Sequence, residues 1–266
     1  MRKIIFSILL GVIFSLPLTA CHRSSPKDEL QVGTISGPET ELMQVAAQVA
    51  QQRYGLKVHI IEFSDYAIPN VALNEGSLDA NMFQHEAYLK NTINQRHFSL
   101  VAVAKTFVYP MGIYSKKIKS LQEIPVGALV LIPNDPTNEA RALLLLQKAN
   151  LITLKSGDNE NATVRSIQNN DKKLKIKEMD AAELPRTLDD AILAVINTNY
   201  AIPAGLTPQK DALFLEDKHS PYANLLVVRE GDVNNPKIKQ LIESLHSEQV
   251  KQKAVILFHG QAIEAW

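Results

Sequence analysis

The sequence feature that most constrains the fold is an apolar run that leads directly into a capped helix. Residues 128–132, Ala-Leu-Val-Leu-Ile, have the composition of a buried strand. Asp135 follows in the position of a helix N-cap, and Pro136 in that of the first helical residue. We therefore expect a strand that feeds a helix whose free N–H groups point outward from the end of a sheet.

Such a helix end can bind an anion, because its unpaired amides and the helix dipole both favour negative charge. Arg141 lies about one turn into the helix, where it can add a bidentate clamp for a carboxylate. An ordinary capped helix with a solvated arginine explains the same residues. This segment alone leaves both interpretations open.

The same alternation occurs near the start of the chain and predicts an α/β fold. Residues 30–35 alternate as a strand, apolar residues within 42–50 recur at helical spacing before Gly55, and residues 57–63 form a second strand. A strand, a helix and a strand in this order make parallel neighbours in one sheet. A second block repeats the logic, with strands predicted at residues 128–132, 174–179, 191–196 and 212–217.

Two segments between these blocks are expected to cross between two lobes. Residues 107–114 have the pattern of an aromatic strand that Pro110 and Gly112 interrupt, which favours a crossover. The return crossover is expected where the turn-like residues 220–224 precede a predicted strand over residues 225–229. Helical periodicity over residues 236–258 predicts C-terminal helices that pack back on the first lobe. The predicted division is residues 30–110 and 225–266 for lobe 1 and residues 111–224 for lobe 2.

Three shorter segments have weaker patterns. Residues 161–167 and 183–190 are each expected to contain a helix, and residues 201–207 to begin another. Trp266 could fasten the end of the sequence to the protein surface.

The N-terminus has the features of a bacterial lipoprotein signal. Two basic residues precede an apolar stretch over residues 4–16, which is too short for a comfortable membrane span. Leu18-Thr19-Ala20-Cys21 then fits the lipoprotein processing box, in which the cysteine takes the lipid. We expect residues 1–20 to be a signal peptide, Cys21 the lipidation site and residues 21–29 a lipidated tether. A plain secretory signal with a chance cysteine is the alternative.

Composition and motifs exclude several classes of function. The chain has 28 basic and 28 acidic residues, and the signal peptide contains two of the basic ones, so the mature charge near −2 gives no case for nucleic acid. The single cysteine excludes a disulfide framework and, once lipidated, a thiol nucleophile. The seven histidines lack paired spacing for a metal, and no Gly-rich phosphate loop or Gly-x-Ser-x-Gly elbow occurs. We therefore expect no enzyme, no cofactor and no metal.

Aromatic and polar side chains gather where strands are expected to end, which is where open α/β sheets bind ligands. Tyr66 follows the second strand. Phe83, His85 and Tyr88 follow where a third strand should end. Together, these four side chains could form an apolar wall with polar tips. The alternative for any one of them is that it packs in the hydrophobic core and contacts no ligand. Asn197 ends another predicted strand.

Several longer segments occur together and in order over nearly the whole mature chain. They are Ser64-Asp65-Tyr66, Pro69-Asn70, Asp79 to His85, Thr106 to Pro110, Tyr114 to Lys117, Pro133 to Asn138, Leu184 to Asp190 and Ser220 to Leu225. These segments resemble the NlpA family of methionine-binding lipoproteins, which serve bacterial ABC importers. Motifs of this length and number are highly specific to a family.

The resemblance implies a two-lobed periplasmic-binding-protein fold, type II-like, in which each lobe is a mixed, mostly parallel sheet flanked by helices. Two crossovers at a hinge join the lobes. The family binds methionine, as the L or D isomer, and delivers it to an ABC permease driven by an ATPase subunit. We accordingly expect a monomer, anchored by its lipid to the cell membrane and facing the periplasm. The alternatives are a binding lipoprotein for a different amino acid or small peptide, and a non-transport adhesin or structural lipoprotein.

The resemblance also implies roles for individual residues. Arg141 and Asn138 would bind the ligand carboxylate, and the partners of the carboxylate and amino group would be Asn197 and Asn224. The wall around the thioether, a soft group that suits aromatic edges, would consist of Tyr66, Phe83, His85 and Tyr88. A ligand held in this way bridges both lobes and favours their closed arrangement.

Overall fold

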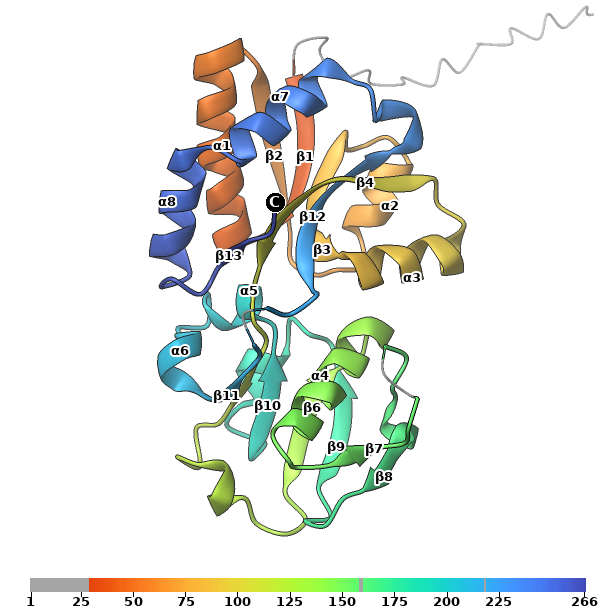
Figure 1. Ribbon diagram of the computed structural model, residues 1–266, viewed down its shortest axis with the longest axis vertical. Helices are drawn as coiled ribbons and strands as arrows, with labels where there is room; N and C mark the ends of the chain where they lie inside the picture. Colours follow the sequence, from red (N-terminus) through yellow and green to blue (C-terminus); the bar gives the residue numbers. More distant parts are fainter. Residues whose placement is uncertain (1–28, 158–159, 218) are drawn as a thin grey trace, which may run out of the picture.

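The computed structural model describes residues 29–157, 160–217 and 219–266. These residues form two lobes, stacked along the long axis of the molecule in Figure 1, and each lobe contains a β-sheet flanked by helices. The predicted signal peptide, the lipidation site Cys21 and the tether up to residue 28 lie outside the described residues. The α/β architecture with two lobes, predicted from the sequence, is confirmed.

Six strands form the sheet of lobe 1, in the order β13-β4-β12-β3-β1-β2. Their bounds are Glu29–Ile35 (β1), Lys57–Phe63 (β2), Ala80–His85 (β3), Leu100–Val108 (β4), Ala223–Arg229 (β12) and Ile263–Glu264 (β13). β1 runs parallel to β2 and β3, as the order of strand, helix and strand predicts. β12 runs antiparallel to both β3 and β4.

Helices cover both faces of this sheet (Figure 1). One face packs against α1 (Pro38–Tyr54), α7 (Pro236–Leu245) and α8 (Glu248–Leu257), and the other against α2 (Pro69–Asn74) and α3 (Glu86–Arg96). Successive residues of β12 show the alternation, since Leu226 belongs to the first core and Val227 to the second. Gly55 ends α1 in the left-handed conformation, with a φ of 68°, which confirms the predicted stop.

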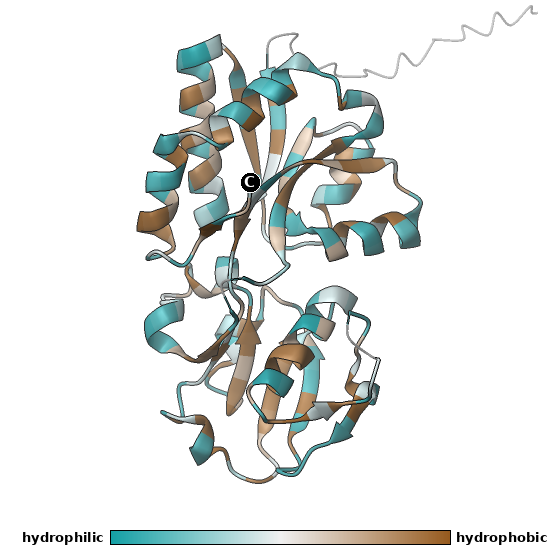
Figure 2. Cartoon of the chain, in the orientation of Figure 1, coloured by the Kyte–Doolittle hydropathy of each residue, from teal (hydrophilic) through white to brown (hydrophobic). Residues whose placement is uncertain are grey.

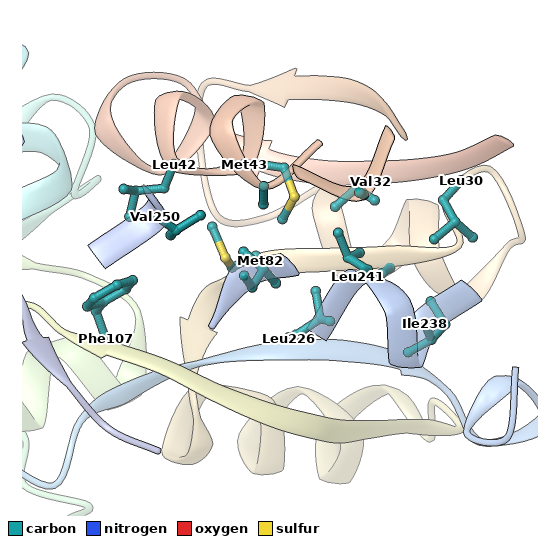
Figure 3. Close-up of a cluster of buried hydrophobic side chains, with 14 of the residues drawn as sticks. Leu30, Val32, Leu42, Met43, Met82, Phe107, Leu226, Ile238, Leu241 and Val250 are labelled. Atoms are coloured by element: carbon teal, nitrogen blue, oxygen red, sulfur yellow. The ribbon is translucent and has the colours of Figure 1, made fainter. Parts of the chain in front are cut away.

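The larger core of lobe 1 lies between the sheet and the helices α1, α7 and α8 (Figure 3). Val32, Met82 and Leu226 from three strands meet Met43 of α1 and Leu241 of α7, and none of these five side chains is more than 1% exposed. Figure 2 shows α3 as largely hydrophilic and α1 as a mixture of hydrophilic and hydrophobic residues. This core fixes β3, which carries part of the site described below.

Lobe 2 contains a five-stranded sheet in the order β11-β5-β10-β6-β9. The bounds are Gly112–Tyr114 (β5), Leu129–Pro133 (β6), Lys175–Met179 (β9), Leu193–Ile196 (β10) and Ala212–Leu215 (β11), with helices Pro136–Lys148 (α4), Thr198–Ala201 (α5) and Pro208–Asp211 (α6). β6 runs parallel to β9 and β10, whereas β5 runs antiparallel to β10 and β11. The sequence predicted mostly parallel sheets, and this part of the prediction is wrong. Parallel pairs do not predominate in either sheet, because β5 and β12, the strands that follow the crossovers, run antiparallel to their neighbours.

The chain passes between the lobes at the two places that the sequence indicates. β4 ends in lobe 1 at Val108 and β5 begins in lobe 2 at Gly112, so the expected strand over 107–114 is divided between two sheets by its Pro and Gly residues. The return runs from β11, which ends at Leu215, to β12. β12 begins at Ala223, two residues before the predicted start of the second part of lobe 1.

Three expectations about short helices need correction. Residues 161–167 form only a 3₁₀ turn, Val164–Ser166, because the next strand, β8 (Ile167–Asn169), pairs with β7 (Thr153–Leu154). No helix begins within residues 201–207, because α5 starts directly after β10 and stops at Ala201, just before Pro203, which cannot donate a helical hydrogen bond. Residues 183–190 contain a single 3₁₀ turn, Leu184–Thr187, in place of an α-helix.

Trp266 does fasten the end of the sequence to lobe 1. Its ring stacks on His246, with the ring centres 4.2 Å apart and the planes 4° from parallel, and it meets Phe107 edge-on. β13 also pairs with the last residues of β4, next to the first crossover.

We predict that Leu241→Ala lowers the free energy of unfolding by about 2–5 kcal/mol, because it removes a fully buried side chain and leaves a cavity between α7 and the sheet. Urea unfolding followed by circular dichroism measures the change. Ile256→Ala on α8 is the control, since this side chain is 68% exposed and its loss should change stability by no more than about 0.5 kcal/mol. Equal effects of the two substitutions would contradict this assignment of the core.

Candidate functional site

A narrow cavity lies between the lobes, with an empty volume of about 360 Å³. Its lining consists of Tyr66, Phe83, Gln84, His85, Tyr88, Tyr109, Asn138, Arg141, Asn197, Thr198, Asn199 and Asn224. All eight residues that the sequence pointed to as ligand-binding are among them, although they come from six separate segments of the chain. Their roles toward a ligand remain predictions.

The aromatic side of the cavity belongs to lobe 1. Tyr66 lies in the loop after β2, Phe83 on β3 and Tyr88 on α3, and their ring centres are 5.7–5.9 Å apart. The Tyr88 hydroxyl donates to the Tyr66 carbonyl at 2.9 Å, which fixes the loop against the helix. Tilted and edge-on contacts of this kind stabilise aromatic clusters by about 0.5–1.5 kcal/mol per pair. The three rings therefore form a preformed apolar wall.

A buried amide network holds β3 behind this wall. Asn70 and Gln84 exchange side-chain hydrogen bonds of 2.8 and 2.6 Å, and Asn81 donates to Asn70 at 2.9 Å. All three residues are at most 2% exposed. Because buried amides are costly unless they are paired, a closed network of this kind specifies one arrangement of the strand.

His85 connects the wall to the polar side of the cavity. As the N-cap of α3, its Nδ1 accepts a hydrogen bond from the Tyr88 N–H at 3.2 Å. The proton of the neutral ring is therefore on Nε2, which lies 3.4 Å from Asn138 Oδ1. Burial and the nearby charge of Arg141 lower the pKa of His85 to about 3, so the ring is uncharged at neutral pH.

The polar side begins at the first turn of α4, in lobe 2. Asp135 is the N-cap, as predicted, and accepts from the backbone N–H of Asn138 at 3.0 Å. The same carboxylate accepts from the Asn138 side chain at 3.0 Å, and Asn197 donates to Asn138 Oδ1 at 2.8 Å. The helix end is therefore occupied by its own cap, and the side chain of Asn138 is committed to neighbours within the protein.

Arg141 is buried together with a carboxylate that the sequence patterns did not indicate. Its Nε donates to Glu216 Oε1 at 3.1 Å and its Nη2 to Glu216 Oε2 at 2.5 Å, a bidentate pair. The guanidinium also lies 4.4 Å from the ring centre of Tyr222. Nη1 makes no hydrogen bond within the described residues, so it is the nitrogen left for a ligand.

A second buried carboxyl group lies beside Asn224. The Asn224 side chain donates to Glu39 Oε1 at 2.6 Å, and Asn224 is the strand partner of His85 across β12 and β3. Glu39 is in the first turn of α1 and is completely buried. Burial raises the pKa of Glu39 to about 8, although the nearby side-chain amides of Asn224 and Asn199 lower it.

Hydrogen bonds join the two lobes directly across the cavity. The Tyr66 hydroxyl donates to Asn199 Oδ1 at 2.8 Å, and the Tyr200 hydroxyl donates to the Ser64 carbonyl at 3.3 Å. Asn199 and Tyr200 belong to α5 in lobe 2, whereas Tyr66 and Ser64 follow β2 in lobe 1. The lobes are therefore closed over the cavity in this structure.

Sequence reasoning missed four residues that shape the site, namely Glu39, Asn199, Glu216 and Tyr222. Asn199 and Tyr222 lie within segments already singled out, the amide-rich end of β10 and the Ser220 to Leu225 motif. Glu39 follows a helix-initiating proline and has the pattern of an ordinary first-turn acid. Glu216 directly follows β11, a strand with no distinguishing pattern, so nothing in its neighbourhood indicated that it pairs with Arg141.

These contacts give the cavity two chemically different ends. One end is aromatic, and the other is lined with amides around the Arg141–Glu216 pair, whose charges cancel. The cavity suits a small molecule with an apolar part and a polar end. Within the described residues, no group of histidine, cysteine and acidic side chains could hold a metal, and no helix is long and apolar enough to span a membrane.

The model of the NlpA lipoprotein family matches residues 30–266. The chain belongs to this family. It is 47% identical over 264 residues to a protein of Escherichia coli (strain K12) named "D-methionine-binding lipoprotein MetQ", covering 98% of this chain and 97% of that protein. The resemblance to the NlpA family that the sequence motifs carry is thereby confirmed.

Two solved structures show the same fold. One is an ABC transporter periplasmic substrate-binding protein from Coxiella burnetii, with 58% identity and a TM-score of 0.87, covering 89% of this chain and 100% of that one. The other is a nutrient-binding protein from Burkholderia cenocepacia bound to methionine, with 49% identity, a TM-score of 0.87 and the same coverage of both chains.

We predict that Glu216→Ala destabilises this NlpA-family protein by about 3–5 kcal/mol, because it leaves the buried Arg141 guanidinium without its counter-charge. Guanidinium chloride unfolding measures the change. The matched control is Asp217→Ala, which removes an exposed acid from the neighbouring position. Comparable stability of the two variants would contradict the structural importance of the pair.

We also predict that protonation of His85 destabilises the protein in mild acid. The folded state binds fewer protons at His85 than the unfolded state between pH 6.5 and about 3, so this contribution to stability falls as the pH drops below 6.5. Between pH 7 and pH 5 the loss should be about 2 kcal/mol. Urea unfolding at both pH values should give a smaller loss for His85→Gln than for wild type, while the exposed His59→Gln should match wild type. An unchanged loss in His85→Gln would count against a buried neutral ring.

Proposed function

We propose that this protein is an extracytoplasmic substrate-binding lipoprotein that captures methionine in the cavity between its lobes and delivers it to an ABC permease. The observation that carries the proposal is the cavity itself, which gathers all eight expected ligand-binding residues from both lobes. Relatives that share the family and nearly half of the sequence are named for methionine binding, and one was solved with methionine bound.

The two ends of the cavity match the two parts of methionine. The thioether side chain would lie against Tyr66, Phe83 and Tyr88, since a polarizable sulfur gains from aromatic edges. The carboxylate would accept from Nη1 of Arg141, the guanidinium nitrogen without a partner, and from the amides that surround it. Because the Arg141–Glu216 pair is neutral, this end favours a zwitterion over an anion with no positive group.

Ligand capture would work by hinge closure. The wall belongs to lobe 1 and Arg141 to lobe 2, so a bound ligand touches both and stabilises the closed arrangement. The two crossovers, between β4 and β5 and between β11 and β12, provide the only chain connections between the lobes in the described part of the protein and would form the hinge. The permease would then recognise the closed form and receive methionine unchanged, without catalysis.

The remaining parts of the proposal concern location and assembly. Lipidation at Cys21 would anchor the protein to the membrane facing the periplasm, with residues 21–29 as the tether. The protein would act as a monomer with lobe 1 formed by residues 30–110 and 225–266 and lobe 2 by residues 111–224. Its partners would be the permease and its ATPase subunit.

The test is a binding panel on the purified protein. Mass spectrometry under denaturing conditions first identifies any small molecule that co-purifies. Thermal shift and calorimetry with L- and D-amino acids should then give the largest stabilisation with one or both isomers of methionine. A stronger response to another amino acid or a small peptide would replace methionine as the ligand. A lack of response to all of them, with no co-purified molecule, would favour an adhesin or structural lipoprotein.

We predict that Asn224→Ala weakens methionine binding by about tenfold or more, because the ligand loses a hydrogen-bonding amide in a buried site. Isothermal titration calorimetry measures the affinity. The control is Asn94→Ala, which changes the same residue type at an exposed position of α3. Undiminished affinity in Asn224→Ala would show that this amide takes no part in binding.

A further inference from the structure

Glu39 is the one completely buried acid at the cavity whose second oxygen has no partner within the described residues. Its Oε1 accepts from Asn224, on β12 of lobe 1, at 2.6 Å. Among the residues that the structure describes, its Oε2 has no hydrogen-bond partner, and neither does the side-chain nitrogen of Asn199, on α5 of lobe 2. Asn199 nevertheless influences the ionisation of Glu39, so the two side chains are close. Two unsatisfied buried polar atoms thus lie where the lobes meet.

We propose that Glu39 is a positioning residue for the ammonium group of the ligand: it holds the side chain of Asn224, which lines the cavity, toward that group, and becomes the buried counter-charge when the ligand binds. The inference rests on the proposed function, since it requires an amino-acid ligand. It assigns to the polar end of the cavity a counter-charge for the ammonium group, in addition to the Arg141 Nη1 group proposed for the carboxylate.

Within the described part of the chain, the side chains that alter the pKa of Glu39 include no protein cation that could neutralise it. The charge of Glu39 contributes to the raised pKa values of three tyrosines, Tyr66, Tyr109 and Tyr200. The side chains that alter the pKa of Glu39 itself are the amides of Asn224 and Asn199. No lysine, arginine or histidine among the described residues is one of them. A buried carboxylate without a cation is strongly disfavoured, and a buried carboxylic acid with an unpaired oxygen is also costly. An ammonium group beside Asn224, which lines the cavity, would relieve both costs.

This arrangement predicts that ligand binding releases a proton. Without ligand, burial raises the pKa of Glu39 to about 8, so the carboxyl group is mostly protonated at pH 7. An adjacent ammonium group favours the carboxylate and lowers that pKa, and the proton passes to the buffer. Below pH 8 the affinity for methionine should therefore rise with pH, by up to about tenfold per pH unit.

Titration calorimetry of methionine at pH 7 in phosphate and in Tris, which differ in ionisation enthalpy, counts the protons released per binding event. We expect wild type to release most of one proton and Glu39→Gln to release markedly fewer, with methionine affinity at least tenfold weaker. The substituted amide keeps an acceptor for Asn224 but carries no charge. Burial, together with the neighbouring Glu178, raises the pKa of Glu139 to about 7, so Glu139 can titrate in the same range. Both proteins contain Glu139, so its contribution cancels when their proton release is subtracted.

The matched control is Glu41→Gln, which removes an acid from the same turn of α1 where its carboxylate pairs with Lys253 on the surface. This variant should release as many protons as wild type. Equal proton release by wild type and Glu39→Gln would overturn the proposal. If wild type releases no proton on binding methionine, the proposal is also overturned. That measurement does not depend on how the variant folds. If wild type does not bind methionine in any buffer, the proposed function fails instead.

Discussion

The buried pair of Arg141 and Glu216 is the interaction on which the arrangement of site and hinge depends. Arg141 lies on α4 in lobe 2, and Glu216 begins the return crossover. The same two side chains bind the first crossover, because Arg141 Nη2 donates to the Tyr109 carbonyl at 2.9 Å and Glu216 Oε2 accepts from the Met111 N–H at 3.1 Å. One ion pair therefore ties both crossovers to the helix that presents Arg141 to the cavity.

Such a pair contributes more to geometry than to net stability. Removing two charges from water costs several kcal/mol per ion, and the attraction between them offsets that cost only with good geometry and further hydrogen bonds. Here the backbone groups of Tyr109 and Met111 supply those hydrogen bonds. The charges of Arg141 and Glu216 cancel and His85 is neutral, so the cavity holds little net charge before a ligand enters. This balance suits a ligand that is itself neutral overall but carries both charges.

Local patterns in the sequence predicted much of this structure. The alternation of strand, helix and strand gave the parallel pairs of both sheets, Asp135 was identified as a cap, and Pro110 and Gly112 indicated the first crossover. Residues 161–167 were mispredicted because a strand pairing, which no local pattern reveals, overrode a weak helical spacing. The partners of the site residues were equally hidden, since Glu216 lies 75 positions from Arg141 and Glu39 lies 185 positions from Asn224. The motifs could name residues at the cavity, but only the fold could show which charges face each other.

The bonds between the lobes explain why such a cavity needs its ligand to close firmly. Direct contacts across it include one good hydrogen bond, from Tyr66 to Asn199 at 2.8 Å, and longer ones at 3.3 and 3.4 Å. Each contributes only about 0.5–1.5 kcal/mol net, because opening lets water replace it. Meanwhile Glu39 Oε2, Asn197 Oδ1 and Asn199 Nδ2 stay unsatisfied in the closed state, which opposes closure. A ligand that forms hydrogen bonds with these atoms and fills the space beside the aromatic wall removes this penalty. The favourable free energy of closure therefore comes chiefly from the ligand.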